Sequence, residues 1–125
     1  MQPTPSDEDV TGFISATFRS VWALEVLLFL KQAPERSWDR SELVAALRAS
    51  DSVIAHSVDG LLAAGLAVSE GGRTRYGPAS VQLARLVHAT EAHYAQRPDA
   101  TRRLIILPRH DGLSAFADAF RLRKD

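Results

Sequence analysis

Residues 37–78 read SWDRSELVAALRASDSVIAHSVDGLLAAGLAVSEGGRTRYGP, and this stretch decides the fold of the chain. Asp39 followed by Glu42 has the spacing of an N-terminal capping box, which predicts a helix that starts here and runs to about Ala49. Apolar residues recur within it at helical spacing, so we expect one face of this helix to be buried.

A second helix is expected over residues 52–64, directly after a short turn. Serine and aspartate at residues 50–52 supply turn and capping groups in front of it. Gly65 follows it and suits the left-handed conformation that ends many helices. Two helices joined in this way can present the second one to a DNA major groove.

The stretch closes with two expected strands, residues 66–70 and 73–77. They are joined by Gly71-Gly72, and a two-residue glycine loop favours the primed turn of a β-hairpin. Pro78 lacks the amide hydrogen that further pairing would need. The predicted fold class is therefore mainly α, with a small antiparallel β-hairpin.

The residues before this stretch are expected to form a tail and one helix. Residues 1–10 contain prolines and a run of acids, which indicates a flexible acidic tail. From Thr11 onward, apolar residues at spacings of three and four predict a single long helix, which Pro34 ends. Residues 11–78 would then be the main domain.

The residues after the hairpin, 79–125, are expected to form further helices of the same domain. Ser80 can cap a fourth helix, and Pro98 ends it. Residues 101–107 fit either a buried strand or a short helix, because an apolar run of this length does not distinguish the two. A last amphipathic helix is expected over residues 113–123.

Composition and motifs exclude several classes of function. The chain has 125 residues, enough for one domain with a core, and no cysteine, which excludes a disulfide scaffold, a zinc–thiolate site and a cysteine nucleophile. The histidines lack metal-ligand spacing, and no catalytic or phosphate-binding motif is present. We therefore expect no metal, no cofactor and no enzymatic activity.

Charge and hydropathy narrow the expected location and partners. The first residues lack the basic start and apolar run of an export signal, and no apolar run is long enough to span a bilayer, so we expect a cytoplasmic protein without a membrane contact. Residues 1–70 hold five basic and ten acidic side chains, whereas residues 71–125 hold ten basic and five acidic. The neutral total argues against general polyanion binding, and the basic second half allows a local phosphate-binding face.

The order of helices and hairpin places particular residue types at defined spacings: Trp38, Glu42, Leu43, Leu47, Val58, Leu61, Leu62, Gly65 and Leu66. With these positions, residues 13–78 resemble the winged helix-turn-helix domain. The size of the chain, with helices after the hairpin, is similar to that of small bacterial regulators of the MarR and PadR type.

The resemblance implies how the chain would bind duplex DNA. The helix over residues 52–64 would enter the major groove as the recognition helix, and the hairpin would contact the backbone as the wing. The contacts implied on the recognition helix are Ser52, Ala55, His56 and Asp59. Those implied on the wing are Arg73, Thr74, Arg75 and Tyr76, and the preceding helix adds Arg40 and Arg48.

The charge of the recognition helix leaves a second interpretation open. The helix carries Asp59 and no Lys or Arg, although the phosphate contacts that dominate DNA affinity need positive charge. Arg73 and Arg75 share a face of their strand, which fits either a phosphate-contacting wing or an ordinary solvated hairpin. The alternative function is a winged-helix module that binds another protein and does not bind DNA tightly.

The helices after the hairpin carry apolar stripes that two copies could bury against each other. The expected homodimer contacts are Leu83, Leu86, Val87, Tyr94, Phe116 and Phe120. The competing interpretation is that the last helix folds back onto its own domain. A homodimer would also double the small set of basic DNA contacts.

Overall fold

The computed structural model describes residues 4–107. Its elements follow one another as α1 (Asp7–Thr17), α2 (Val21–Gln32), β1 (Trp38–Asp39), α3 (Arg40–Leu47), α4 (Asp51–Ala63), β2 (Ala67–Glu70), β3 (Arg73–Tyr76), α5 (Val81–Gln96) and α6 (Pro98–Ile106). The described chain is mainly helical with a small antiparallel sheet, as the sequence predicts, and the arrangement is compatible with a winged helix.

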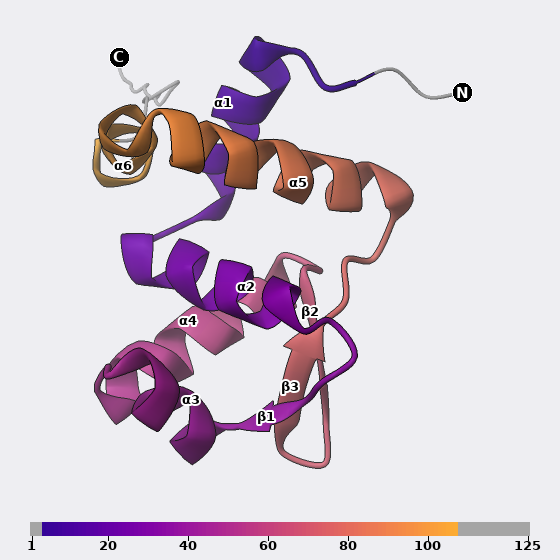
Figure 1. Cartoon of the computed structure of the whole chain (residues 1–125), viewed down its shortest axis with the longest axis vertical. Helices are drawn as coiled ribbons and strands as arrows, with labels where there is room; N and C mark the ends of the chain where they lie inside the picture. The colour runs from indigo at the N-terminus through magenta and orange to yellow at the C-terminus, as the bar shows by residue number, and fades with distance from the viewer. Residues whose placement is uncertain (1–3, 108–125) are drawn as a thin grey trace, which may run out of the picture.

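The helices form two groups, which lie one above the other in Figure 1. The upper group contains α1, α5 and α6, and the lower group contains α2, α3, α4 and the sheet. α2 joins the two groups, because it packs against α4 below and contacts α6 above. The core runs through both groups and includes Ile14 of α1, Leu27 of α2, Leu61 of α4 and Val87 of α5, all of them fully or almost fully buried.

The single long helix predicted before the hairpin region was wrong, because α1 and α2 are separate helices bent by 112°. Phe18 is buried in an extended conformation at the break. The hydroxyl of Ser20 then accepts a hydrogen bond from the amide of Ala23 at 3.1 Å, which caps α2. Spacing alone does not reveal the break, since apolar residues continue at helical intervals across it.

α1 also begins earlier than expected, because residues 7–10 are helical and not part of a flexible tail. Ser6 and Asp9 form a capping box: the Ser6 hydroxyl accepts from the Asp9 amide at 3.0 Å, and the Asp9 carboxylate accepts from the Ser6 amide at 3.2 Å. Val10 is buried in the core. The acids that suggested disorder are therefore residues of a first helical turn, where negative charge is stabilising.

The predicted hairpin forms, and it gains a third strand. β2 and β3 pair antiparallel across Gly71 and Gly72, whose φ angles of +60° and +77° are those of a primed turn. β1 consists of Trp38 and Asp39 and pairs with the other edge of β3, so the strand order is β1-β3-β2. A strand of this length has no periodicity, so the sequence does not reveal it.

α5 and α6 follow the hairpin. The hydroxyl of Ser80 caps α5, as predicted. Most of residues 101–107, for which a strand and a helix were both considered, belong to α6. Pro98 ends α5 and also starts α6, since its fixed φ suits the first position of a helix. The helix expected over residues 113–123 lies outside the described residues.

A buried polar pair connects α5 to α6. His93 Nδ1 lies 2.6 Å from the hydroxyl oxygen of Thr101, and that hydroxyl donates to the carbonyl of Arg97 at 2.8 Å. Because the Thr101 proton is used in this way, its oxygen accepts a hydrogen bond from His93, which then carries its proton on Nδ1. The pair satisfies two buried polar groups and fixes the corner between the helices.

Gly77 lies directly after β3, and the space beside it is taken by Val68. A Cβ atom on Gly77 would lie 2.6 Å from Val68 Cγ2, which belongs to a stiff β-branched side chain. We expect Gly77→Ala to lower the free energy of unfolding, measured by urea denaturation, by about 1–3 kcal/mol, as overpacking usually does. Gly12→Ala is the control, because a Cβ there meets nothing within 4 Å. Equal stability of the two variants would contradict the expected clash.

Candidate nucleic-acid interface

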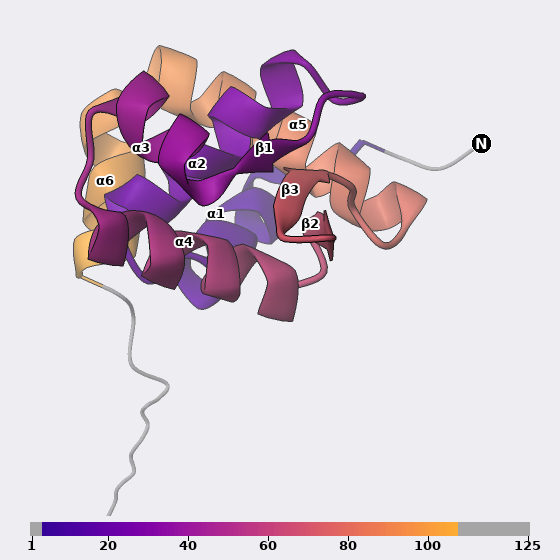
Figure 2. The ribbon, with the colours of Figure 1, turned by 90° about the horizontal axis from the view of Figure 1, so that it is seen from below.

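α3, α4 and the sheet lie on one face of the molecule, which Figure 2 shows from below. α3 packs against α4, and residues 48–50 form the short turn between them. A groove of about 260 Å³ lies among α3, α4 and the hairpin, and its lining includes Arg40, Asp59 and Ser69. The structure therefore brings the helix pair and the hairpin together around one groove.

Local sequence determines where α4 begins and ends. The hydroxyl of Ser50 caps it by accepting a hydrogen bond from the amide of Val53 at 3.2 Å. At the other end Gly65, with φ +75°, reverses the chain so that the amide of Leu66 donates to the carbonyl of Leu61 at 3.0 Å. Leu61 and Leu66 are both buried, so the end of α4 and the start of the hairpin are held in the same core.

Three of the four side chains predicted to face outward from α4 do so. Ser52, His56 and Asp59 are exposed, whereas Ala55 is half-buried in the lining of the groove. The charged side chains of α4 are Asp51 and Asp59, both acidic. The exposed face of α4 thus offers hydrogen-bonding groups and negative charge.

Arg73 does not act as the free phosphate contact that was expected. Its guanidinium lies 3.0 Å from Glu42 Oε1 and 3.6 Å from Asp39 Oδ2, and it donates to the hydroxyl and the carbonyl of Ser37 at 3.1 and 3.0 Å. The amide of Glu42 and, to a smaller extent, Arg73 lower the pKa of Asp39. Two carboxylates therefore balance the charge of Arg73, which ties the hairpin to the start of α3.

Thr74 and Tyr76 also differ from the expected wing contacts, because they face inward. Thr74 is buried, and Tyr76 packs half-buried against the core. Burial, with a smaller effect of Glu91, raises the pKa of Tyr76. Arg75 points to the other side of the strand, is exposed, and has no ion-pair partner within residues 4–107. Of the four hairpin residues predicted to contact DNA, Arg75 is thus the exposed one without an ion-pair partner in the described chain.

The two basic residues predicted on α3 and its turn are exposed, but their surroundings differ. Arg40 forms an ion pair with Asp51 at 3.4 Å, and because both side chains are solvated this pair is weak. Arg48 ends α3 with φ +56°, a left-handed conformation that is uncommon for a residue with a side chain. Residues 36–76 hold five arginines and five acidic side chains, so this part of the chain is neutral as a whole.

One basic residue beside α4, Arg19, was not predicted from the sequence to lie there. A hollow of about 790 Å³ lies between α4 and the bend that joins α1 to α2, and its lining includes Arg19, His56 and Asp59. The bend brings Arg19 next to a helix that follows it by more than thirty residues. The signal for the bend in the sequence is Ser20, a residue type that often caps helices.

The contacts that Arg73 makes with Ser37, Asp39 and Glu42 should stabilise the folded chain. Arg73→Ala removes two ion pairs and the hydrogen bonds to Ser37. Because the side chains are partly solvated, we expect urea denaturation to show a loss of only about 1 kcal/mol in the free energy of unfolding. Arg75→Ala is the matched control and should change stability by less than about 0.5 kcal/mol. Equal losses in the two variants would show that the contacts of Arg73 do not stabilise the folded chain.

The α5 residues predicted for a dimer interface lie largely against the chain's own core. Val87 is fully buried, so it cannot contact a second copy, and Leu83 packs against the same core. Tyr94 donates a hydrogen bond to Glu25 of α2 at 2.5 Å, and its pKa is raised, first by burial and then by that carboxylate. Leu86 is half-buried.

The remaining residues predicted for that interface, Phe116 and Phe120, lie outside the described residues. The large apolar side chains that α5 and the end of α6 leave exposed are Val81, Ile106 and Leu107. Val81 lies at the start of α5, whereas the other two lie at the end of α6, so they belong to different parts of the surface.

Comparison with known proteins adds no relative: no protein-family model, no curated protein and no solved structure matches the chain. Within residues 4–107 no single helix has the length and apolar character to cross a membrane. Helices α1 and α2 together are long and apolar enough by length and composition alone, but they are bent sharply against each other. The same residues contain no group of three His, Cys, Asp or Glu side chains that could hold a metal ion.

Proposed function

We propose that the chain is a DNA-binding transcriptional regulator, in which α4 is the recognition helix and β2 and β3 are the wing of a winged helix-turn-helix. The observation that carries the proposal is the grouping of the exposed polar face of α4 with the hairpin around one groove. Ser52 and His56 can hydrogen-bond to base edges or phosphates. Duplex DNA would lie across α4 with the wing beside it.

The positive charge for phosphate contacts would come from residues that flank α4. Arg19 lies on one side of it, in the hollow at the bend between α1 and α2. Arg40, Arg48 and Arg75 come from α3, the turn and the wing. α3 packs against α4, and β3, which carries Arg75, pairs with β2, a strand that contacts α4. One duplex could therefore meet these side chains together.

Four arginines make a small set of phosphate contacts, and we propose that a homodimer doubles it. Most of the predicted α5 residues pack against the chain's own core, so we propose that the exposed Ile106 and Leu107 at the end of α6 contribute to the contact between copies. They lie on the upper helix group, away from the wing (Figure 1). Two wings would then remain open to one duplex.

One observation favours an alternative, a winged-helix module that docks on another protein. Arg73 is balanced by Asp39 and Glu42, and Arg40 is paired with Asp51, so the face is nearly neutral. A non-obligate protein interface has about the same polarity as the rest of a protein surface and needs no net positive charge, whereas DNA interfaces are strongly positive. The alternative would use the same groove without a duplex.

Fluorescence anisotropy with a labelled random-sequence duplex, titrated from low to physiological salt, separates the two proposals. DNA binding predicts saturable binding at low salt and a logarithm of affinity that falls linearly with the logarithm of salt concentration. Absence of binding at low salt would refute the DNA proposal and favour protein docking. Sedimentation of the same samples measures whether two copies are present.

A further inference from the structure

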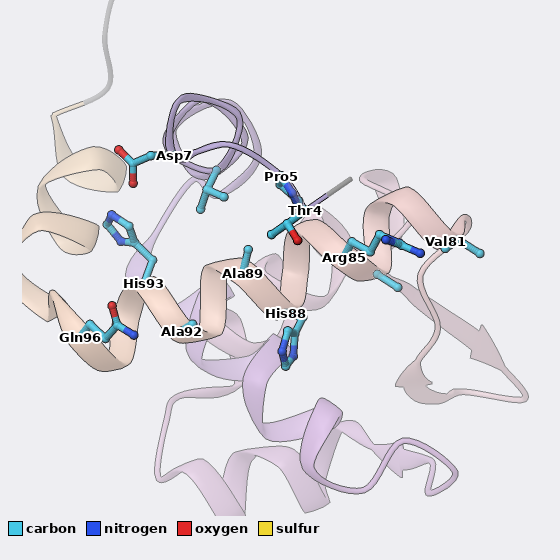
Figure 3. Close-up of a pocket in the computed structure, with 12 residues that line it drawn as sticks. Thr4, Pro5, Asp7, Val81, Arg85, His88, Ala89, Ala92, His93 and Gln96 are labelled. Carbon is cyan, nitrogen blue, oxygen red and sulfur yellow. The ribbon is translucent and has the colours of Figure 1, made fainter. Parts of the chain in front are cut away.

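An apolar groove between α1 and α5 is not used by the proposed function (Figure 3). Its volume is about 650 Å³, and most of the side chains that line it come from α5. The lining contributed by α5 includes Ala84, Ala89 and Ala92, and α1 contributes Val10. Small side chains on α5 leave room for large ones, so the groove is shaped to accept bulky apolar groups.

The groove is as long as a short helix. Its lining extends along α5 from Val81 to Gln96, a helix of 16 residues and therefore about 24 Å. Val81 is 62% exposed, which is unusual for a large apolar side chain and shows that this end of the groove is uncovered within the described chain.

We propose that residues 113–123 of the same chain occupy the α1–α5 groove. Their sequence predicts an amphipathic helix with Leu113, Phe116 and Phe120 on one side. Such a helix is about 16 Å long, so it fits within the length of the groove. The two phenylalanine rings would fill the space above the alanines of α5.

The course of the chain supports this occupant. Leu107, where the described chain ends, lines a hollow together with His93. His93 also lines the α1–α5 groove, so the chain ends beside the groove at its α6 side. Residues 108–112 can span up to about 17 Å when extended. The segment can therefore enter the groove at this end and run antiparallel to α5.

One acidic side chain of α1 lies near the end of the groove that the basic end of the segment would reach. The first turn of α1 carries Asp7, Glu8 and Asp9, all of them exposed. Asp7 lines the groove, and Asp9 lines the hollow that adjoins it. The segment ends in basic residues, namely Arg121, Arg123 and Lys124. A segment that runs antiparallel to α5 would bring these basic residues to the end of the groove near Gln82 and Arg85, where Asp9 is the acidic neighbour. Asp7 lies at the other end, beside His93 (Figure 3).

Paramagnetic relaxation tests the proposal, and the absence of cysteine makes the labelling specific. A spin label is attached to Ala115→Cys, which lies opposite the apolar side of the expected helix. We expect a loss of amide signal intensity in residues 84–92 of α5 and 7–10 of α1. No loss at these residues would overturn the proposal. The proposal does not depend on DNA binding, so the experiment is carried out without DNA.

Two further samples identify the occupant. Adding Phe116→Glu and Phe120→Glu should restore the lost signals, whereas Ser114→Glu and Ala119→Glu, the same charge change off the apolar side, should not. Isotope-labelled chain without a spin label is also mixed with spin-labelled chain at natural isotope abundance. Signal loss in this mixture would show that the segment docks on a second copy, which would overturn docking within one chain. Equal signals in the mixture and in unlabelled protein would support it.

Discussion

Replacing Arg48 and Arg75 with glutamate should weaken binding to duplex DNA by about 100-fold or more near physiological salt. Both side chains are exposed, and neither has an ion-pair partner within residues 4–107. Each phosphate contact releases counterions, so the loss of two contacts and the gain of two repulsions act together in every copy. The slope of the logarithm of affinity against the logarithm of salt concentration should become shallower in the same titration.

The matched control makes the same change of charge at two arginines that lie away from α4 and the hairpin. Arg97 and Arg103 are exposed at α6, in the upper helix group (Figure 1), and their replacement with glutamate alters the net charge equally. We expect this control to weaken binding by less than about 10-fold, through long-range electrostatics alone. Equal weakening by the two pairs would mean that net charge, and not the face formed by α4 and the wing, determines DNA affinity.

Leu61→Ala should lower the free energy of unfolding by about 2–5 kcal/mol, the range observed for buried leucines. Leu61 is 1% exposed and lies on the inner side of α4, which packs against α2. A domain of this size has about 5–15 kcal/mol of stability, so the variant loses a large share of it. Urea denaturation monitored by circular dichroism measures the change.

The control for this variant lies on the same helix. Ala63 is exposed near the end of α4, and Ala63→Gln should change the free energy of unfolding by less than about 0.5 kcal/mol. If Leu61→Ala were as mild as Ala63→Gln, the inner face of α4 would not be part of the core. The orientation of α4, and with it the exposed position of His56, would then be wrong.

The elements with local signals were predictable from the sequence. α4 and the hairpin begin and end within one residue of the prediction, because Ser50, Gly65, Gly71 and Gly72 act through contacts with near neighbours in the chain. The bend between α1 and α2 was missed although Ser20 caps α2 in the same way. Apolar residues continue at helical spacing across this bend, which predicts one helix, and a single capping residue is a weaker signal.

The candidate site was predictable only in part. The predictions that were wrong concern residues whose partners are distant in the sequence. The periodicity of α4 places Ser52 and His56 outward correctly. The sequence does not reveal that Arg73 meets Glu42, a partner 31 residues away, so its charge appeared to be free. The apolar stripe of α5 was recognised, but periodicity does not say what covers a stripe, and Val87 packs within its own chain.

A nuclear magnetic resonance titration of the isotope-labelled chain with a random-sequence duplex at low salt tests the central claim most directly. We predict that the amides of residues 52–59 in α4 and 71–75 in the wing shift together and with the same salt dependence. Shifts confined to α5 and α6 in a chain that binds the duplex, or no shifts at all, would contradict the assignment of α4 and the wing as a DNA-binding surface.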